Sequence, residues 1–112
     1  MVSPPANVTG FGSMPEAGFF AKALTAEKPP PHWSAPLLGL WHAARGDWEK
    51  AHDCVRLDET AEAAWVHAHL HRIEGDLDNA RYWYGVAGRP FSSAPLDEER
   101  EAIGAELLSA GG

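Results

Sequence analysis

The residues with the clearest chemical potential lie in the segment WVHAHLHRIEGD, residues 65–76. His67, His71 and Glu74 have the spacing i, i+4 and i+7, which places them on one face of a helix. Two imidazoles one turn apart, together with a carboxylate, can bind zinc or another divalent metal. His42, from a neighbouring segment, is a candidate for a further ligand. The sequence therefore predicts a polar cluster made of His42, His67, His71 and Glu74.

Two other interpretations of these histidines remain open. The imidazoles can replace larger side chains between packed helices, each hydrogen-bonded to a carbonyl, a carboxylate or an aromatic hydroxyl. Alternatively, His67 or His71 can act as a general base that Glu74 or Asp76 orients. No nucleophile motif accompanies them, and Asp76 is expected to cap a helix. The packing interpretation is favoured, and it needs neither a cofactor nor catalytic activity.

Composition limits the classes of function. The chain has 112 residues, 45% of them hydrophobic, and a formal net charge of −7. That length suits one small domain, and the negative charge disfavours nucleic acid and anionic membranes as partners. No segment approaches the roughly 20 apolar residues of a membrane span, and the N-terminus lacks the pattern of a secretory signal. Cys54 is the only cysteine, so no internal disulfide can form. We therefore expect a cytoplasmic protein.

The spacing of apolar residues predicts an all-α fold, because no segment alternates as a strand does. Residues 1–33 are expected to be a Pro/Gly-rich arm that can form a short helix over 15–27. Residues 91–112 should form a loop and a C-terminal capping helix. The predicted helices outside the arm run over residues 34–45, 48–57, 60–74, 77–87 and 96–109.

Residues 37–59 and 66–88 repeat each other at an offset of 29. The matching positions are Gly46-Asp47 with Gly75-Asp76, Ala51 with Ala80, and His42 with His71. Glycine accommodates the left-handed conformation that ends a helix, and aspartate accepts hydrogen bonds from the free N–H groups that begin the next one. The repeat therefore predicts two helix-turn-helix units, stacked on each other within residues 34–90.

The second unit, residues 61–90, has small and aromatic residues at fixed distances from its Gly-Asp turn. They are Ala68 before the turn, and Ala80, Tyr84 and Ala87 after it. In these positions the unit resembles the tetratricopeptide repeat. The first unit matches less closely, since Val55 replaces the aromatic residue and Asp58 the final alanine. The offset is also shorter than the roughly 34 residues usual for that repeat.

The resemblance implies two tetratricopeptide-like antiparallel helical hairpins with terminal capping helices. In that family the paired helices form a groove that grips a segment of a partner, so it also implies a protein- or peptide-binding domain without catalytic activity. The expected groove residues are Leu40, Trp65, His69 and Arg72, with His69 exposed. Self-association is a further expectation, because a stack of two units leaves apolar edges that a second copy could cover.

Overall fold

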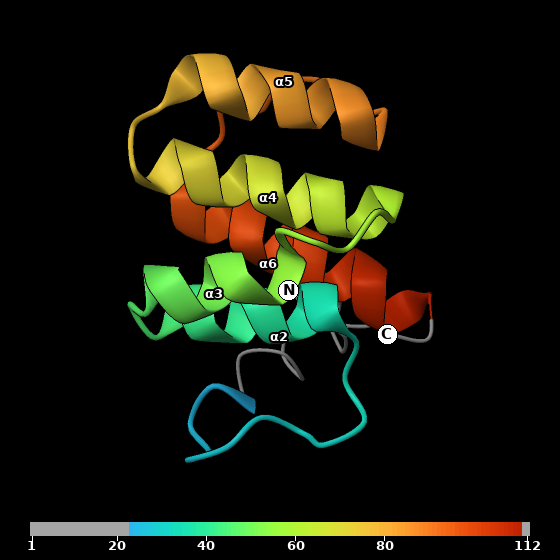
Figure 1. The fold of residues 1–112 in the computed structure, drawn as a ribbon. Helices are drawn as coiled ribbons and strands as arrows, with labels where there is room; N and C mark the ends of the chain where they lie inside the picture. Colours follow the sequence, from blue (N-terminus) through green and yellow to red (C-terminus); the bar gives the residue numbers. More distant parts are fainter. Residues whose placement is uncertain (1–22, 111–112) are drawn as a thin grey trace, which may run out of the picture.

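The computed structural model describes residues 23–110, and this part of the chain consists of helices and connecting loops without a strand (Figure 1). The helices are α2 (Ala35–Ala44), α3 (Trp48–Val55), α4 (Ala61–Ile73), α5 (Leu77–Ala87) and α6 (Leu96–Ser109). The predicted all-α fold is confirmed. Most of the predicted arm, including most of the helix expected over 15–27, lies outside the described residues.

The two Gly-Asp turns, which join α2 to α3 and α4 to α5, have the same backbone geometry. Gly46 and Gly75 both have a φ of +83°, in the left-handed region where a Cβ is strained. Asp47 and Asp76 are the N-caps of α3 and α5, and each side chain accepts a hydrogen bond from the backbone N–H three residues later. The chemistry predicted for both turns is therefore confirmed.

The helices pack in consecutive pairs, α2 with α3 and α4 with α5, and α4 lies near the middle of the molecule (Figure 1). Helix α6 packs against both α2 and α4. The main core lies among α2, α3, α4 and α6; its largest aliphatic members include Leu37, Leu40, Leu70 and Ile103. A smaller cluster of Ala68, Ala80 and Tyr84 joins α4 to α5. Helix α4 therefore belongs to both clusters.

Gly39 allows α2 to approach its neighbours closely. A Cβ at this position would lie 3.2 Å from Val55 Cγ1 and 3.3 Å from Val66 Cγ1. These side chains belong to α3 and α4, so a small residue here lets three helices meet.

Among the described residues, no helix combines the length and apolarity needed to cross a membrane.

Candidate functional site

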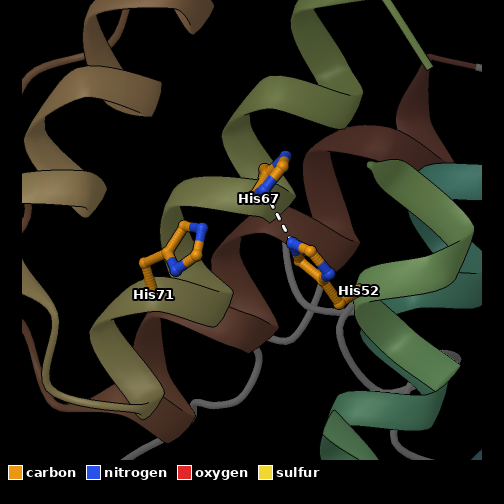
Figure 2. Close-up of side chains that lie close together, drawn as sticks. All are labelled: His52, His67 and His71. Carbon is orange, nitrogen blue, oxygen red and sulfur yellow. Dashed lines mark hydrogen bonds between the residues drawn. The ribbon is translucent and has the colours of Figure 1, made fainter. Parts of the chain in front are cut away.

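Three imidazoles meet where α3 packs against α4 (Figure 2). His52 comes from α3, and His67 and His71 come from α4. Each ring offers one ligand atom, and these atoms all lie within 4.8 Å of one another. His52 Nε2 and His67 Nε2 are 3.0 Å apart and share a hydrogen bond. We call these three residues the histidine cluster.

Helical spacing on two adjacent helices brings the rings together. His67 and His71 are one turn apart on α4, and Trp48 and His52 are one turn apart on α3. Trp48 Nε1 donates a 2.7 Å hydrogen bond to the backbone carbonyl of Leu70. This bond joins α3 to α4 beside the rings, so it helps to fix His52 relative to the two histidines on α4.

Two tryptophan rings stack on imidazoles of the histidine cluster. Trp48 stacks on His52 with ring centroids 4.7 Å apart, and Trp83, from α5, stacks on His67 at 3.9 Å with an interplanar angle of 10°. His67 and His71 are also stacked, with centroids 4.9 Å apart. The histidine cluster is thus bordered by apolar ring faces from α3 and α5, which reduce its contact with water.

Glu74 forms a hydrogen bond with the Nδ1 atom of His71. Their Nδ1 and Oε1 atoms are 2.5 Å apart. A carboxylate at this position assigns the imidazole proton to Nδ1, which then donates the hydrogen bond. The lone pair is left on Nε2. The predicted pairing of His71 with Glu74 on one helix face is therefore present.

Burial lowers the pKa of two imidazoles of the histidine cluster, those of His52 and His67. Desolvation, together with the nearby His52 and His71, lowers the pKa of His67 to about 4. Desolvation also lowers the pKa of His52, with His71 contributing to the same effect. Both rings are therefore neutral near pH 7, which is the form in which an imidazole can bind a metal.

The structure does not bring His42 into this cluster. Its ring lies edge-on to Trp41, and the charged residues that influence it are Lys50, Asp47 and Arg45 around the first Gly-Asp turn. His42 lies on α2 before the first Gly-Asp turn, and it is not among the histidines whose ligand atoms lie within 4.8 Å of one another. The third imidazole is instead His52, from the second helix of the first pair. Sequence reasoning did not identify it.

The expectation that His69 is exposed is wrong. Its side chain is 1% exposed, because α6 covers this face of α4. Leu40 is likewise buried, as a member of the main core. Of the expected groove residues, Trp65 and Arg72 remain partly exposed. The face predicted to be an open groove is thus largely covered by the chain's own α6.

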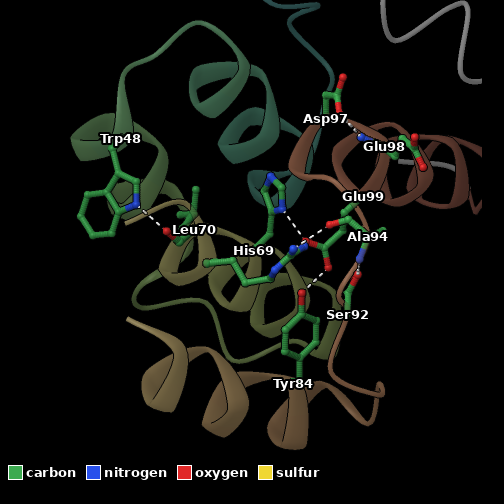
Figure 3. Close-up of polar contacts among 10 residues, drawn as sticks. Trp48, His69, Leu70, Tyr84, Ser92, Ala94, Asp97, Glu98 and Glu99 are labelled. Carbon is green, nitrogen blue, oxygen red and sulfur yellow. Dashed lines mark hydrogen bonds and ion pairs between the residues drawn. The ribbon is translucent and has the colours of Figure 1, made fainter. Parts of the chain in front are cut away.

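A buried carboxylate holds α6 in that position (Figure 3). Glu99 receives hydrogen bonds from His69 Nδ1 at 2.7 Å, from Arg72 Nη1 at 2.7 Å and from the Tyr84 hydroxyl. Burial of Glu99 opposes its ionisation, but the hydrogen bonds from His69, Tyr84 and Arg72 outweigh this effect and lower its pKa. His69 and Arg72 therefore bind Glu99 and join α4 to α6. We call these four residues the Glu99 network.

A hollow of about 420 Å³ lies beside Trp65, one of the predicted groove residues, and is also lined by Phe91 and Glu98. The Arg89 guanidinium lies 3.8 Å from the centre of the Trp65 ring and pairs with Glu106. The cationic group of this hollow is therefore already engaged on both sides, and the hollow offers no clear preference for one class of ligand.

Comparison of the chain with protein-family models, with curated proteins and with solved structures found no significant match. The interpretation of the histidine cluster consequently depends on its own geometry and chemistry.

Proposed function

We propose that this protein binds a divalent transition-metal ion, with zinc preferred, through His52, His67 and His71. The observation that carries the proposal is that three imidazoles from two helices offer ligand atoms within 4.8 Å of one another. Imidazole nitrogen suits zinc, copper, nickel and iron. Zn–N bonds of 2.0–2.1 Å in a tetrahedral site place neighbouring nitrogens about 3.3 Å apart. The 3.0 Å between His52 and His67 is close to that separation, and side-chain rotation would have to bring the three ligand atoms, now within 4.8 Å of one another, to it.

Two further features support a metal rather than packing alone. A histidine that binds a metal commonly donates its other N–H to a carboxylate, which fixes the tautomer and makes the ligand more basic. Glu74 provides this contact to His71. The depressed pKa of His67 also means that a metal does not have to displace a proton from that ring near pH 7.

The test is metal analysis and calorimetry on protein purified without an affinity tag or chelator. We expect close to one equivalent of zinc, lost in His52→Ala and in His71→Ala. Glu74→Gln should weaken zinc binding about 10- to 100-fold, as removal of such a partner does at other sites. His42→Ala is the matched control, and it should bind like the wild type. Absence of zinc binding in the wild type, or loss in the His42 variant with retention in the His52 variant, would contradict the proposal.

Protein binding by a tetratricopeptide-like domain is the second candidate function. The repeated turn geometry favours it, since both glycines share one φ and both aspartates cap in the same way. Because α6 covers the groove that the resemblance implied, we propose the outer side of α5 as the surface for a partner helix or a second copy of the chain. Tyr82 and Val86 are 63% and 49% exposed there. The cytoplasm is the proposed compartment, in keeping with a free thiol at Cys54.

Self-association gives a direct test of this second candidate. Light scattering over a range of concentrations should show a dimer that Tyr82→Glu and Val86→Glu weaken. Leu57→Glu is the control, because Leu57 is an apolar residue that is 77% exposed and lies in the turn after α3, outside α5. A monomer at all concentrations would exclude the second copy, and cross-linking to a partner that ignores the α5 variants would exclude this surface.

A further inference from the structure

We infer that a metal ion held by the histidine cluster keeps an open fourth coordination position that takes a small anion. This inference rests on the proposed metal-binding function. It adds that the site is of the open kind, in which an exogenous ligand completes the coordination, rather than a closed structural site.

The protein supplies three ligands to the ion. Within residues 23–110, the group that contains His52 and His67 has His71 as its third member. Glu74 and Asp76 form a separate group with His71, which does not include His52 or His67. Glu74 is bonded to Nδ1 of His71, so it lies on the ring edge away from Nε2. These carboxylates therefore support the cluster from outside and do not complete it.

Other nearby side chains do not supply the fourth ligand either. Cys54, two residues after His52, packs against the main hydrophobic core. Trp48 and Trp83 present ring faces to the imidazoles, and indole has no lone pair suited to a metal. The Trp48 N–H is also occupied by the Leu70 carbonyl. A tetrahedral ion with three imidazoles consequently has one vacant position.

The charge of the site favours an anion as the fourth ligand. Three neutral imidazoles bring no negative charge, so the ion keeps its charge of +2 at the centre of the cluster. Glu74 compensates only partly, since it is in the outer shell and its side chain is 39% exposed. Apolar indole faces lower the local dielectric constant, which strengthens the attraction of the ion for an anion. Hydroxide or another small monovalent anion is therefore favoured over a neutral ligand.

Access to the vacant coordination position limits the size of the anion that can bind there. His67 and His71 are buried, whereas His52 is partly exposed, so the vacant position is reached past the edge of His52. Trp48 lies against the ring of His52 and Trp83 against the ring of His67, so both indoles restrict the space around the vacant position. The formal net charge of −7 repels polyanions from the whole molecule. Both effects favour a small, singly charged ligand.

The test uses the protein loaded with cobalt(II), whose visible absorption reports coordination number and ligand exchange. We expect the spectrum of a tetrahedral ion, and a saturable change in its bands when azide is added, with one azide bound per cobalt. A protein-free cobalt and azide titration gives the blank. The Glu74→Gln variant should show two opposite effects. It should bind cobalt about 10- to 100-fold more weakly than the wild type, whereas its cobalt-loaded form should bind azide more tightly.

The outcomes separate the two proposals. Cobalt that binds but whose spectrum does not respond to azide would show a filled coordination sphere, which overturns this inference and leaves the proposed function intact. The same conclusion follows if azide removes cobalt from the protein, as measured in the dialysate. Failure of the wild type to bind cobalt or zinc overturns both.

Discussion

Acidification of the metal-free protein from pH 7 to pH 4 should remove a specific part of its stability through His67. The pKa of this imidazole falls from the ordinary 6.5 to about 4 in the folded chain. The difference, 6.5 − 4 = 2.5, corresponds to about 3 kcal/mol at 1.36 kcal/mol for each pKa unit. His67 is only 5% exposed, so solvent screening reduces this value little.

The sign follows from the direction of the pKa shift. Between pH 6.5 and pH 4 the unfolded chain binds a proton at this histidine and the folded chain does not. Protons therefore favour the unfolded state, and the free energy of unfolding decreases as the pH falls through this range. Above the unfolded pKa the contribution of His67 to the pH dependence is absent. Below about pH 4 the loss is complete.

The assay is urea unfolding in the presence of EDTA at several pH values, for the wild type and for His67→Phe. Phenylalanine keeps an aromatic ring against Trp83 but cannot be protonated. The free energy difference between the two proteins should change by about 3 kcal/mol between pH 7 and pH 4. Glu99 also loses stabilising contacts in acid, since its pKa is lowered by folding, but this effect is common to both proteins. Equal acid slopes for the wild type and the variant would refute the reasoning.

Three further predictions concern stability measured by denaturant unfolding at pH 7. Gly75→Ala should destabilise the protein by about 1–2 kcal/mol because Gly75 has a φ of +83°. Gly85→Ala, in the exposed last turn of α5 where a Cβ meets nothing within 4 Å, should instead stabilise it by up to about 1 kcal/mol. Equal effects of the two substitutions would show that backbone conformation is not the cause. Glu99→Gln should lower the free energy of unfolding by about 3 kcal/mol or more, because it removes the charge from a buried, hydrogen-bonded carboxylate. The control Glu98→Gln, at an exposed neighbour, should change it by no more than about 0.5 kcal/mol. A small loss at Glu99 would mean that its hydrogen-bond partners do not depend on it. Thr60→Ala should cost about 1 kcal/mol, since the Thr60 hydroxyl accepts a hydrogen bond from Ala63 N at the start of α4, and an unchanged stability would show that solvent replaces this cap.

The sequence was sufficient to predict the parts of the fold that depend on local chemistry. Gly46-Asp47 and Gly75-Asp76 combine a left-handed residue with a capping carboxylate, and such a pair ends one helix and begins the next whatever surrounds it. Helical spacing likewise brought together His67, His71 and Glu74, because residues one turn apart on the same helix are neighbours before any tertiary packing occurs.

The third histidine was missed because it depends on how helices pack. At an offset of 29, His52 aligns with Arg81, so the repeat gives no indication of its role. Its spacing from Trp48 was the available signal, since an aromatic residue and a histidine one turn apart form a face that can meet the histidine face of α4. The preference for His42 came from its match to His71. A match between two positions of the sequence repeat does not predict that their side chains are close in space, and the third imidazole comes from α3 instead of α2.

The burial of His69 could not be predicted for a similar reason. Nothing local distinguishes its surroundings from those of an exposed histidine near Glu62, and its partner Glu99 is 30 residues away. The position of α6 across α2 and α4 decides which face of α4 is covered. The first turn of α6 carries three acidic residues, Asp97, Glu98 and Glu99, and only the packing of α6 decides that Glu99 is the buried one.

The Glu99 network also has a consequence for the evolutionary variation of this chain. A single carboxylate accepts hydrogen bonds from α4 twice and from α5 once, so replacing it leaves His69, Arg72 and Tyr84 with unmet hydrogen bonds. Replacing one of the donors alone leaves the buried carboxylate with too few hydrogen bonds to offset its lost hydration. Homologous sequences are therefore expected to keep or exchange these four positions together, and changes should be tolerated only as coordinated sets.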